Sequence, residues 1–339
     1  MQFETLVQAE DLDHVTTRMM RKELLDSYGP EETARLHRAI PILDFFALIG
    51  LPGLFIANFF VLAHVESWLI AIAIAAVQGL LMTLMGLLNH DLFVHRVWLG
   101  PTLARTIGTF LVAPVQIPFS EYRRVHLKHH RYVGSDADPE RYKLSIDSRL
   151  RRLVFCTFVG LKLAMGGRWT TSYMGTEKAD RTKWYWFEFA INRLVLLGML
   201  WLAIHSPWLG LFGYFVPLLI VAPLLNSFRI IIEHAHRQTG EKCGIATYYK
   251  TGFLSRAIFL WDSGDCHVLH HLFPAIPFYR ISRGLRLAQP VLRSWGFVSI
   301  DSYSELLRGW FLRAYPHGTD WRKLAQETAL KERSPGAAD

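Results

Sequence analysis

Eight histidines fall into three short clusters along the chain. The first cluster is a pair and the other two are triplets: His90 and His95, then His126, His129 and His130, then His267, His270 and His271. Imidazole is the commonest metal ligand in proteins at neutral pH, and eight imidazoles are too many for one ion. The clusters therefore predict a site that holds more than one metal ion.

The two triplets share the spacing His-x-x-His-His. On a helix, positions i+3 and i+4 lie about 300° and 400° around the axis from position i, so all three side chains project from one face and can serve one compact site. His90 and His95 differ, because positions i and i+5 lie about 140° apart on a regular helix. Either the helix ends or distorts between them, or the two histidines bind different ions.

The ligand types narrow the choice of metal. A structural zinc site needs only four ligands and usually includes cysteine, whereas the three cysteines of this chain form no Cys-x-x-Cys pair. The His-Glu-x-x-His spacing of zinc proteases is absent, and the two Glu-x-x-His motifs of soluble di-iron carboxylate proteins are not both present, because Glu233 and His236 form the only such pair in the sequence. Two imidazole-rich ions with few carboxylate ligands suit iron or another redox metal.

The elements that must position these histidines are membrane helices. The chain is 51% hydrophobic and 19% charged over 339 residues, and its apolar residues concentrate in four runs near 41–64, 68–89, 188–204 and 207–226. Each run approaches the roughly 20 residues that cross a bilayer core. We therefore expect an all-α integral membrane protein with four transmembrane helices, paired as two hairpins by the very short gaps within each pair.

Hairpins return the chain to its starting side, which places 1–40, 90–187 and 227–339 in one compartment. These segments hold 36 of the 37 Lys and Arg residues, and the exception is Arg193. The positive-inside rule makes that compartment the cytoplasm, so both termini and the metal site are expected there. The net charge of +8 then reflects topology and attraction to anionic lipid, and we expect no binding to nucleic acid.

Two shorter apolar stretches, Thr102–Phe119 and Leu153–Met165, lie within the expected cytoplasmic segment. We interpret them as re-entrant or interfacial helices, with true membrane spans as the alternative. The expected organisation is a cytoplasmic N-terminal segment 1–40, a membrane domain 41–317 and a polar tail 318–339. A helical cap on the cytoplasmic side would hold the metal site.

Other residues near the clusters could complete the site. His234 and His236 follow the fourth apolar run at the same membrane face; His234 is expected to be a further ligand, and His236 is left open. Cys266 is expected to be a buried thiol rather than a ligand. Candidate hydrogen-bond acceptors for the outer ring nitrogens are the neighbouring acids, for which turn or helix-end roles are equal alternatives: Asp91, Asp138, Glu233, Asp262 and Asp265. Asn226 and Ser227 could hold a metal-bound water, although core or cap positions suit them better.

The order and spacing of the three clusters resemble the membrane fatty acid desaturase superfamily. The similarity extends to the sequence around the second cluster, from Tyr122 to Glu140, and to the segments Asp265–Pro274 and Arg229–His234. In all it covers roughly residues 40–290. The resemblance implies a cytosol-facing di-iron centre that uses dioxygen and two external electrons. Its implied ligands are His90, His95, His126, His129, His130, His234, His267, His270 and His271.

The electrons must come from a separate protein, because the chain contains no Gly-rich dinucleotide fingerprint and no fused haem module. A ferredoxin or a cytochrome b5-like donor is expected. The basic residues beside the second cluster would attract an acidic donor or, equally, phospholipid headgroups: Arg123, Arg124, Lys128 and Arg131.

The expected function is oxygen-dependent desaturation of a fatty acyl chain, carried on a lipid or as a thioester. The alternative within the same chemistry is a carotenoid or other terpenoid hydroxylase or ketolase, or an alkane-type hydroxylase. The four residues between His90 and His95 weakly favour a desaturase. A metal transporter is a different class, which would place polar residues along a path through the spans, and the apolar span interiors argue against it.

Overall fold

The structure is a computed structural model that describes residues 9–132, 182–234, 252–261 and 264–295, together with 250, 297 and 304. Within these residues every regular element is helical, which confirms the all-α prediction. The α-helices are α1 (Ala9–His37), α2 (Pro41–Ala63), α3 (Trp68–Asn89), α4 (Pro101–Val112), α5 (Phe119–Tyr132), α8 (Lys183–His205), α9 (Pro207–Gly210), α10 (Ala222–His234), α11 (Phe253–Ile258), α12 (Asp265–Leu272) and α13 (Phe278–Ser294). The other helical segments are η1 (His90–His95), η2 (Ala113–Val115), η4 (Leu211–Phe215) and η5 (Pro217–Val221).

Four helical stretches are long and apolar enough to cross a membrane. They cover Pro41–Ala63, Trp68–His95, Lys183–His205 and Pro207–Asn226, close to the four predicted runs, although the third begins at Lys183 rather than Glu188. Large apolar side chains on these stretches point away from the protein, with Phe60 68%, Leu69 80% and Ile204 76% exposed. Such surfaces suit contact with lipid tails rather than with water.

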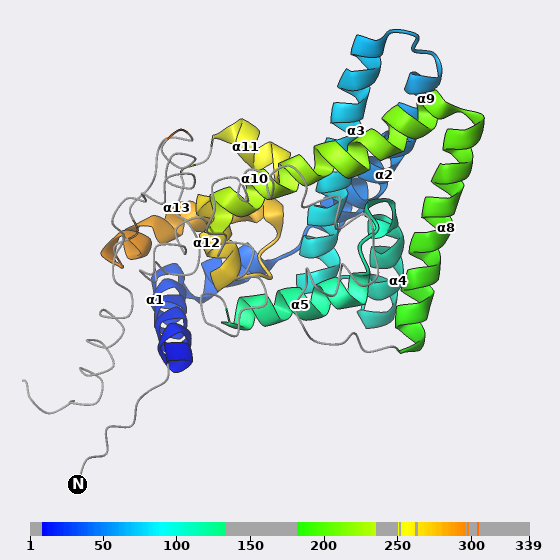
Figure 1. Cartoon of the computed structure of the whole chain (residues 1–339). Coiled ribbons are helices and arrows are strands. Elements are labelled where there is room, and N and C mark those ends of the chain that lie inside the picture. Colours follow the sequence, from blue (N-terminus) through cyan, green and yellow to red (C-terminus); the bar gives the residue numbers. More distant parts are fainter. Residues whose placement is uncertain are drawn as a thin grey trace, which may run out of the picture.

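Helix α3 contacts two of the other three stretches. Helix α2 packs along α3, and η4 and η5 of the fourth stretch also pack on α3, whereas α8 packs against α4, α5 and α9. A single long helical path is formed by α9, η4, η5 and α10, which follow one another along the chain (Figure 1). The upper end of Figure 1 holds the α2–α3 turn and the α8–α9 junction, away from α5 and α12. Gly79 permits the contact with η5, because a Cβ there would lie 2.4 Å from Cβ of Val221.

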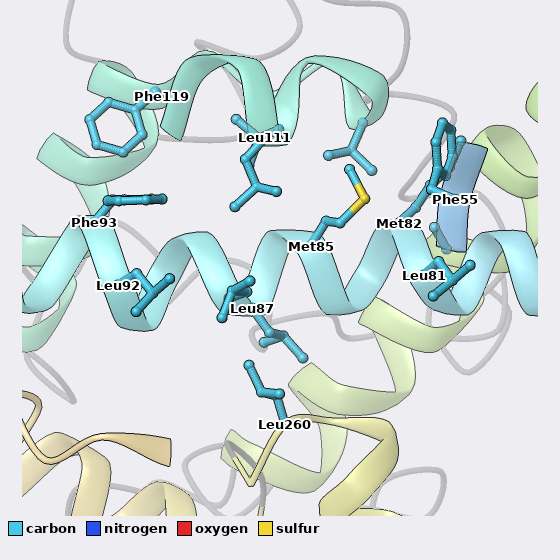
Figure 2. Packing of buried hydrophobic residues seen from close by; sticks show 14 of the residues in the cluster. Phe55, Leu81, Met82, Met85, Leu87, Leu92, Phe93, Leu111, Phe119 and Leu260 are labelled. Atoms are coloured by element: carbon cyan, nitrogen blue, oxygen red, sulfur yellow. The ribbon is translucent and has the colours of Figure 1, made fainter. Parts of the chain in front are cut away.

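Helix α3 runs through the larger hydrophobic core. Figure 2 shows its side chains meeting Leu111 and Phe119 on one side, while Leu87 faces Leu260 on the other. Because α3 is packed on several sides, the direction in which it ends is fixed. That end continues directly into η1, which begins at His90.

The stretch Thr102–Phe119 forms no membrane span. Helix α4 has 12 residues, about 18 Å at the α-helical rise, which is short of a bilayer core about 30 Å thick. It packs against α3 and α8, and a left-handed residue, Gln116, then turns the chain into α5. Leu153–Met165, for which we also expected an interfacial helix, lies outside the described residues.

A second hydrophobic cluster joins α1, α12 and α13. It includes Met20 and Leu24 of α1, Leu269 of α12 and Leu285 of α13, all almost fully buried. The hydroxyl of Tyr28 donates to the carbonyl of Gly284 at 3.0 Å. Helix α1 therefore supports α12, the element that carries the third histidine cluster.

Candidate metal centre

The first cluster lies on a π-helix. Segment η1, His90–His95, continues α3 with the wider turn in which residues five apart bond to each other, and Arg96 N donates to Asp91 O at 3.3 Å. This turn places His90 and His95 on the same side, with their Nε2 atoms 3.1 Å apart. Of the alternatives left by the spacing, the structure shows the distorted helix.

The second cluster, on α5, points in two directions. The Nε2 atoms of His126 and His130 lie 2.8 Å apart, and His126 Nε2 lies 2.7 Å from that of His90. His129 instead faces His271, with ring centroids 5.1 Å apart. His126 and His130 therefore join one cluster of nitrogens, whereas His129 does not, because the 100° between adjacent helical positions separates His129 from His130.

Helix α12 divides its triplet in the same way. His270 Nε2 lies 3.2 Å from His130 Nε2, whereas His267 and His271 have their Nε2 atoms 3.0 Å from each other. The described histidines thus form two groups. The first histidine group is His90, His95, His126, His130 and His270, and the second histidine group is His129, His267 and His271.

The first histidine group fits a metal cation. One nitrogen from each of its five rings lies within 4.8 Å of all the others. His126 Nε2 lies 2.7, 3.0 and 2.8 Å from the Nε2 atoms of His90, His95 and His130. A neutral imidazole carries one proton, so it cannot satisfy three such neighbours by hydrogen bonding, whereas a cation between them accepts every lone pair.

Burial keeps two histidines of this group in the neutral form that binds a cation. It lowers the pKa of His126 and His130 well below the usual histidine value, and the charge of neighbouring histidines, His90 for His126 and His95 for His130, lowers the pKa further. Both rings are therefore neutral at pH 7, which is the form that binds metals.

The second histidine group has a carboxylate beside it. Glu233 Oε2 lies 3.7 Å from His267 Nε2, and Arg229 Nη1 lies 3.3 Å from Glu233 Oε1. His267 Nε2 also faces His271 Nε2, so Glu233 lies near the inner ring nitrogen of His267 rather than near the outer one, for which it was a candidate acceptor. The backbone of His234 follows as the last residue of α10, beside this group's carboxylate; its side chain is outside the described part of the chain.

The other expected supporting residues have varied placements. Asp91 accepts from Arg96, and Asp265 accepts from Arg256 Nη2 at 2.9 Å and from the backbone of Cys266 at 3.0 Å. Cys266 is fully buried in the cluster of α1, α12 and α13. Asn226 is half-buried near the middle of α10. Asp138, His236, Asp262 and the side chain of Ser227 lie outside the described residues.

Two buried carboxylates near the site were missed from the sequence. Asp44, in the first turn of α2, accepts two hydrogen bonds from Arg96. Glu188 of α8 accepts from Arg105 Nε and from the backbone N–H of Ser120, both at 2.9 Å, and also from the hydroxyl of Ser120. Each is an isolated acid within or beside an apolar run, and this was the available signal, because such residues are retained for a reason.

The sequence of the chain is similar to those of known desaturases. The family model described as fatty acid desaturase matches residues 66–298. A chloroplastic omega-3 fatty acid desaturase of Glycine max is 24% identical over 283 residues, which are 74% of this chain and 59% of that protein. An sn-1 acyl-lipid omega-3 desaturase (ferredoxin) of Synechocystis is 23% identical over 275 residues, covering 73% of this chain and 74% of that protein.

A bifunctional desaturase/conjugase of Vernicia fordii is 24% identical over 252 residues, 64% of this chain and 65% of its own length. The chain thus spans less than two thirds of the Glycine max and Vernicia fordii proteins. The family model covers more than half of the chain and all three histidine clusters. The three clusters, the four apolar helices and this match together show that the chain belongs to the fatty acid desaturase family.

Proposed function

We propose that the protein is an oxygen-dependent fatty acyl desaturase with two iron ions, one at each histidine group. The observation that carries this proposal is the convergence of five imidazole nitrogens, three of them from buried side chains, within 4.8 Å. A second imidazole group lies directly beside them, with the rings of His130 and His271 stacked at a centroid distance of 4.3 Å. Two adjacent imidazole-rich sites suit a redox metal such as iron.

The ligand sets follow from the two groups. One iron would be held by His90, His95, His126, His130 and His270. The other would be held by His129, His267 and His271, with His234 as the predicted further ligand and Glu233 as a carboxylate within reach. When bound, the pair of irons supplies the reduction of dioxygen with two external electrons and the oxidation of an acyl methylene pair.

The protein itself fixes the positions of the ligands and limits the access of water to them. His90, His129 and His267 are each at most 2% exposed, so bulk water has little access to these rings, whereas His95 and His130 are partly exposed. A water-poor site protects reactive oxygen chemistry from side reactions. The π-helix, α5 and α12 fix the direction of each ring before any metal arrives.

The substrate class and the electron donor rest on the relatives. The names of the Glycine max and Synechocystis proteins include fatty acids, acyl lipids and ferredoxin. We propose a lipid-linked or thioester-linked acyl chain as substrate and a ferredoxin or a cytochrome b5-like protein as donor. Of the four basic residues considered for donor or headgroup contact, Arg131 is exposed, whereas Arg123 donates to Val94 O and Arg124 pairs with Glu121.

The membrane topology is part of the same proposal. Helices α2 and α3 would form one hairpin, and α8 and the helical path from α9 would form the other, within a membrane domain 41–317. The turns of both hairpins would face away from the cytoplasm. The histidine groups, the helical cap of α1, α12 and α13, and both termini would then be cytoplasmic, in line with the distribution of Lys and Arg.

Expression in a host with simple lipids tests the proposal. Fatty acids and pigments are compared by mass spectrometry for the wild type, for His129→Ala and His270→Ala, and for His205→Ala as a control. His205 is exposed, and its Nδ1 atom lies 2.9 Å from Trp201 O. We expect new alkenes from the wild type and the control and none from the other two variants. Oxygenated pigment with unchanged fatty acids would contradict desaturation.

A further inference from the structure

A buried triad of charged residues adjoins the first histidine group. Arg96 directly follows η1 and donates from Nη1 and Nη2 to the two oxygens of Asp44, each at 2.8 Å. It also donates to Asp91 Oδ2 from Nε at 3.1 Å and from Nη2 at 2.6 Å. The side chains of Arg96, Asp44 and Asp91 are 8%, 0% and 11% exposed. The triad thus ties α2 to the π-helix.

Stability alone does not explain this triad. Burying three charges carries a large desolvation cost, and replacing a buried ion pair with apolar side chains is often neutral or stabilising. The position of Asp44 in the first turn of α2 lets the helix dipole offset part of its cost. A charged group that is kept at such a position in a membrane protein generally has a functional reason.

The backbone beside the triad is strained. Val97 and Leu99 have φ values of 49° and 68°, in the left-handed region that β-branched and bulky residues rarely adopt. The Trp98 N–H donates back to Leu92 O at 2.9 Å. Strain of this kind persists only where the surroundings over-determine the conformation. Arg96 lies between η1 and this turn, and its four hydrogen bonds supply such a constraint.

We propose that Asp44, Arg96 and Asp91 are positioning residues that hold η1 as a π-helix, so that His90 and His95 bind the same ion. If η1 relaxed to a regular α-helix, the two histidines would point about 140° apart. Asp91 anchors Arg96 from inside η1, and Asp44 anchors it to α2. The start of α2 is fixed in turn, because Ile40 N donates to the hydroxyl of Tyr279 on α13 at 2.7 Å.

The triad also contributes charge. One arginine and two carboxylates leave a net charge of −1 beside a site that would receive a cation, within a part of the protein that has little water to screen it. The inference rests on the proposed metal site, and it adds the residues that determine the geometry of the first histidine group.

The test is a cobalt titration of the purified, metal-free full-length protein, followed by visible absorption. Asp44→Asn keeps the shape of the side chain and removes its charge. The matched control is Glu32→Gln, because Glu32 accepts a similar two-point contact from Arg283, at 2.5 and 2.9 Å, on the exposed surface. His126→Ala and His271→Ala give the reference signals for loss of the first and second groups.

We expect Asp44→Asn to bind cobalt about 10–100-fold more weakly at one site, the usual result when a residue supporting a ligand is lost. Its altered spectrum should match that of His126→Ala rather than that of His271→Ala, and Glu32→Gln should match the wild type. Wild-type affinity and spectrum in a folded Asp44→Asn protein would overturn the inference. If Asp44→Asn does not fold, Arg96→Lys decides by the same criteria, because an ammonium with three donors cannot reproduce the four hydrogen bonds that the guanidinium makes to the two carboxylates.

The titration also separates this inference from the function on which it rests. Failure of the wild type to bind cobalt at either group would contradict the proposed metal centre. Normal binding by the wild type with no effect of Asp44→Asn or Arg96→Lys would contradict only the role of the triad.

Discussion

The two histidine groups are built from the same helices but in opposite ways. Helix α5 gives positions i and i+4 of its triplet, His126 and His130, to the first group, and position i+3, His129, to the second. Helix α12 reverses this, giving His270 to the first group and His267 and His271 to the second. Neither group can form on one helix alone, so the two sites depend on the same packing of α5 against α12.

The groups differ in what completes them. The first histidine group receives two more imidazoles from η1 and has the Asp44–Arg96–Asp91 triad next to it. The second has Glu233 of α10 near His267, and Arg229 pairs with that carboxylate. The first group therefore consists of imidazoles alone and adjoins a strained backbone. The second group combines imidazoles with a nearby carboxylate, which comes from the end of α10.

The largest expected effect comes from removing two histidines in different combinations. The double variant His126→Ala/His130→Ala removes two members of the first group, whereas His126→Ala/His129→Ala removes one member from each group. In cobalt titrations we expect His126→Ala/His130→Ala to lose one site and keep the other. His126→Ala/His129→Ala should weaken cobalt binding at both sites by more than about 100-fold, because loss of a ligand weakens metal binding more than loss of a residue that supports a ligand. Identical losses in the two variants would break the division into groups.

A smaller effect is expected at Glu233. Glu233→Gln removes the negative charge beside His267 and nearly preserves the shape of the side chain. We expect metal binding at the second group to weaken by about 10–100-fold, as for loss of a group that contacts a ligand. Metal binding at the first group should not change. The second-group variant His271→Ala provides the reference spectrum. If Glu233→Gln changed the first-group signal instead, Glu233 would belong to the other site.

Substitution of Glu188 is expected to affect both histidine groups equally. It accepts from the backbone N–H of Ser120, near the start of α5, and from Arg105. Glu188→Gln weakens these contacts, and we expect it to destabilise the protein by about 1–3 kcal/mol. Because α5 carries members of both groups, metal loss on heating should occur at both together. Thermal unfolding in detergent, followed by metal absorption, measures this, and loss from one group alone would contradict the shared role of α5.

The smallest expected effect is a pH dependence of the metal-free protein. Burial lowers the pKa of His126 and His130, so the unfolded chain binds more protons than the folded one below the ordinary histidine pKa. Stability should therefore fall as the pH drops below about 6.5, with the unfolding temperature decreasing by several degrees per pH unit. A His126→Asn/His130→Asn variant should show a shallower slope. An unfolding temperature that rises towards acid would contradict the burial of neutral rings.

Hydropathy was enough to predict the four apolar helices, because membrane spans are specified by local composition. The spacing of His90 and His95 also required a helix that ends or distorts, or two ions. The choice of a π-helix could not be made from η1 itself, since it depends on Arg96 reaching Asp44, 52 positions earlier in the chain.

The division of the triplets was beyond sequence reasoning for a similar reason. Helical geometry places His126, His129 and His130 on neighbouring parts of one face, but which of them meets His270 depends on where α12 packs. Asp44 and Glu188 were missed because an isolated acid in an apolar run has no spacing pattern, and its arginine partner comes from a distant part of the sequence.

Iron analysis of two neighbouring variants tests the central claim most directly. His270 and His271 are adjacent on α12 but belong to opposite groups. With protein loaded with iron-57, we expect about two irons per wild-type chain, as for a two-metal centre. His270→Ala should lose one iron and His271→Ala the other, so that their Mössbauer spectra are complementary. A single iron in the wild type, or identical spectra from the two variants, would contradict this claim.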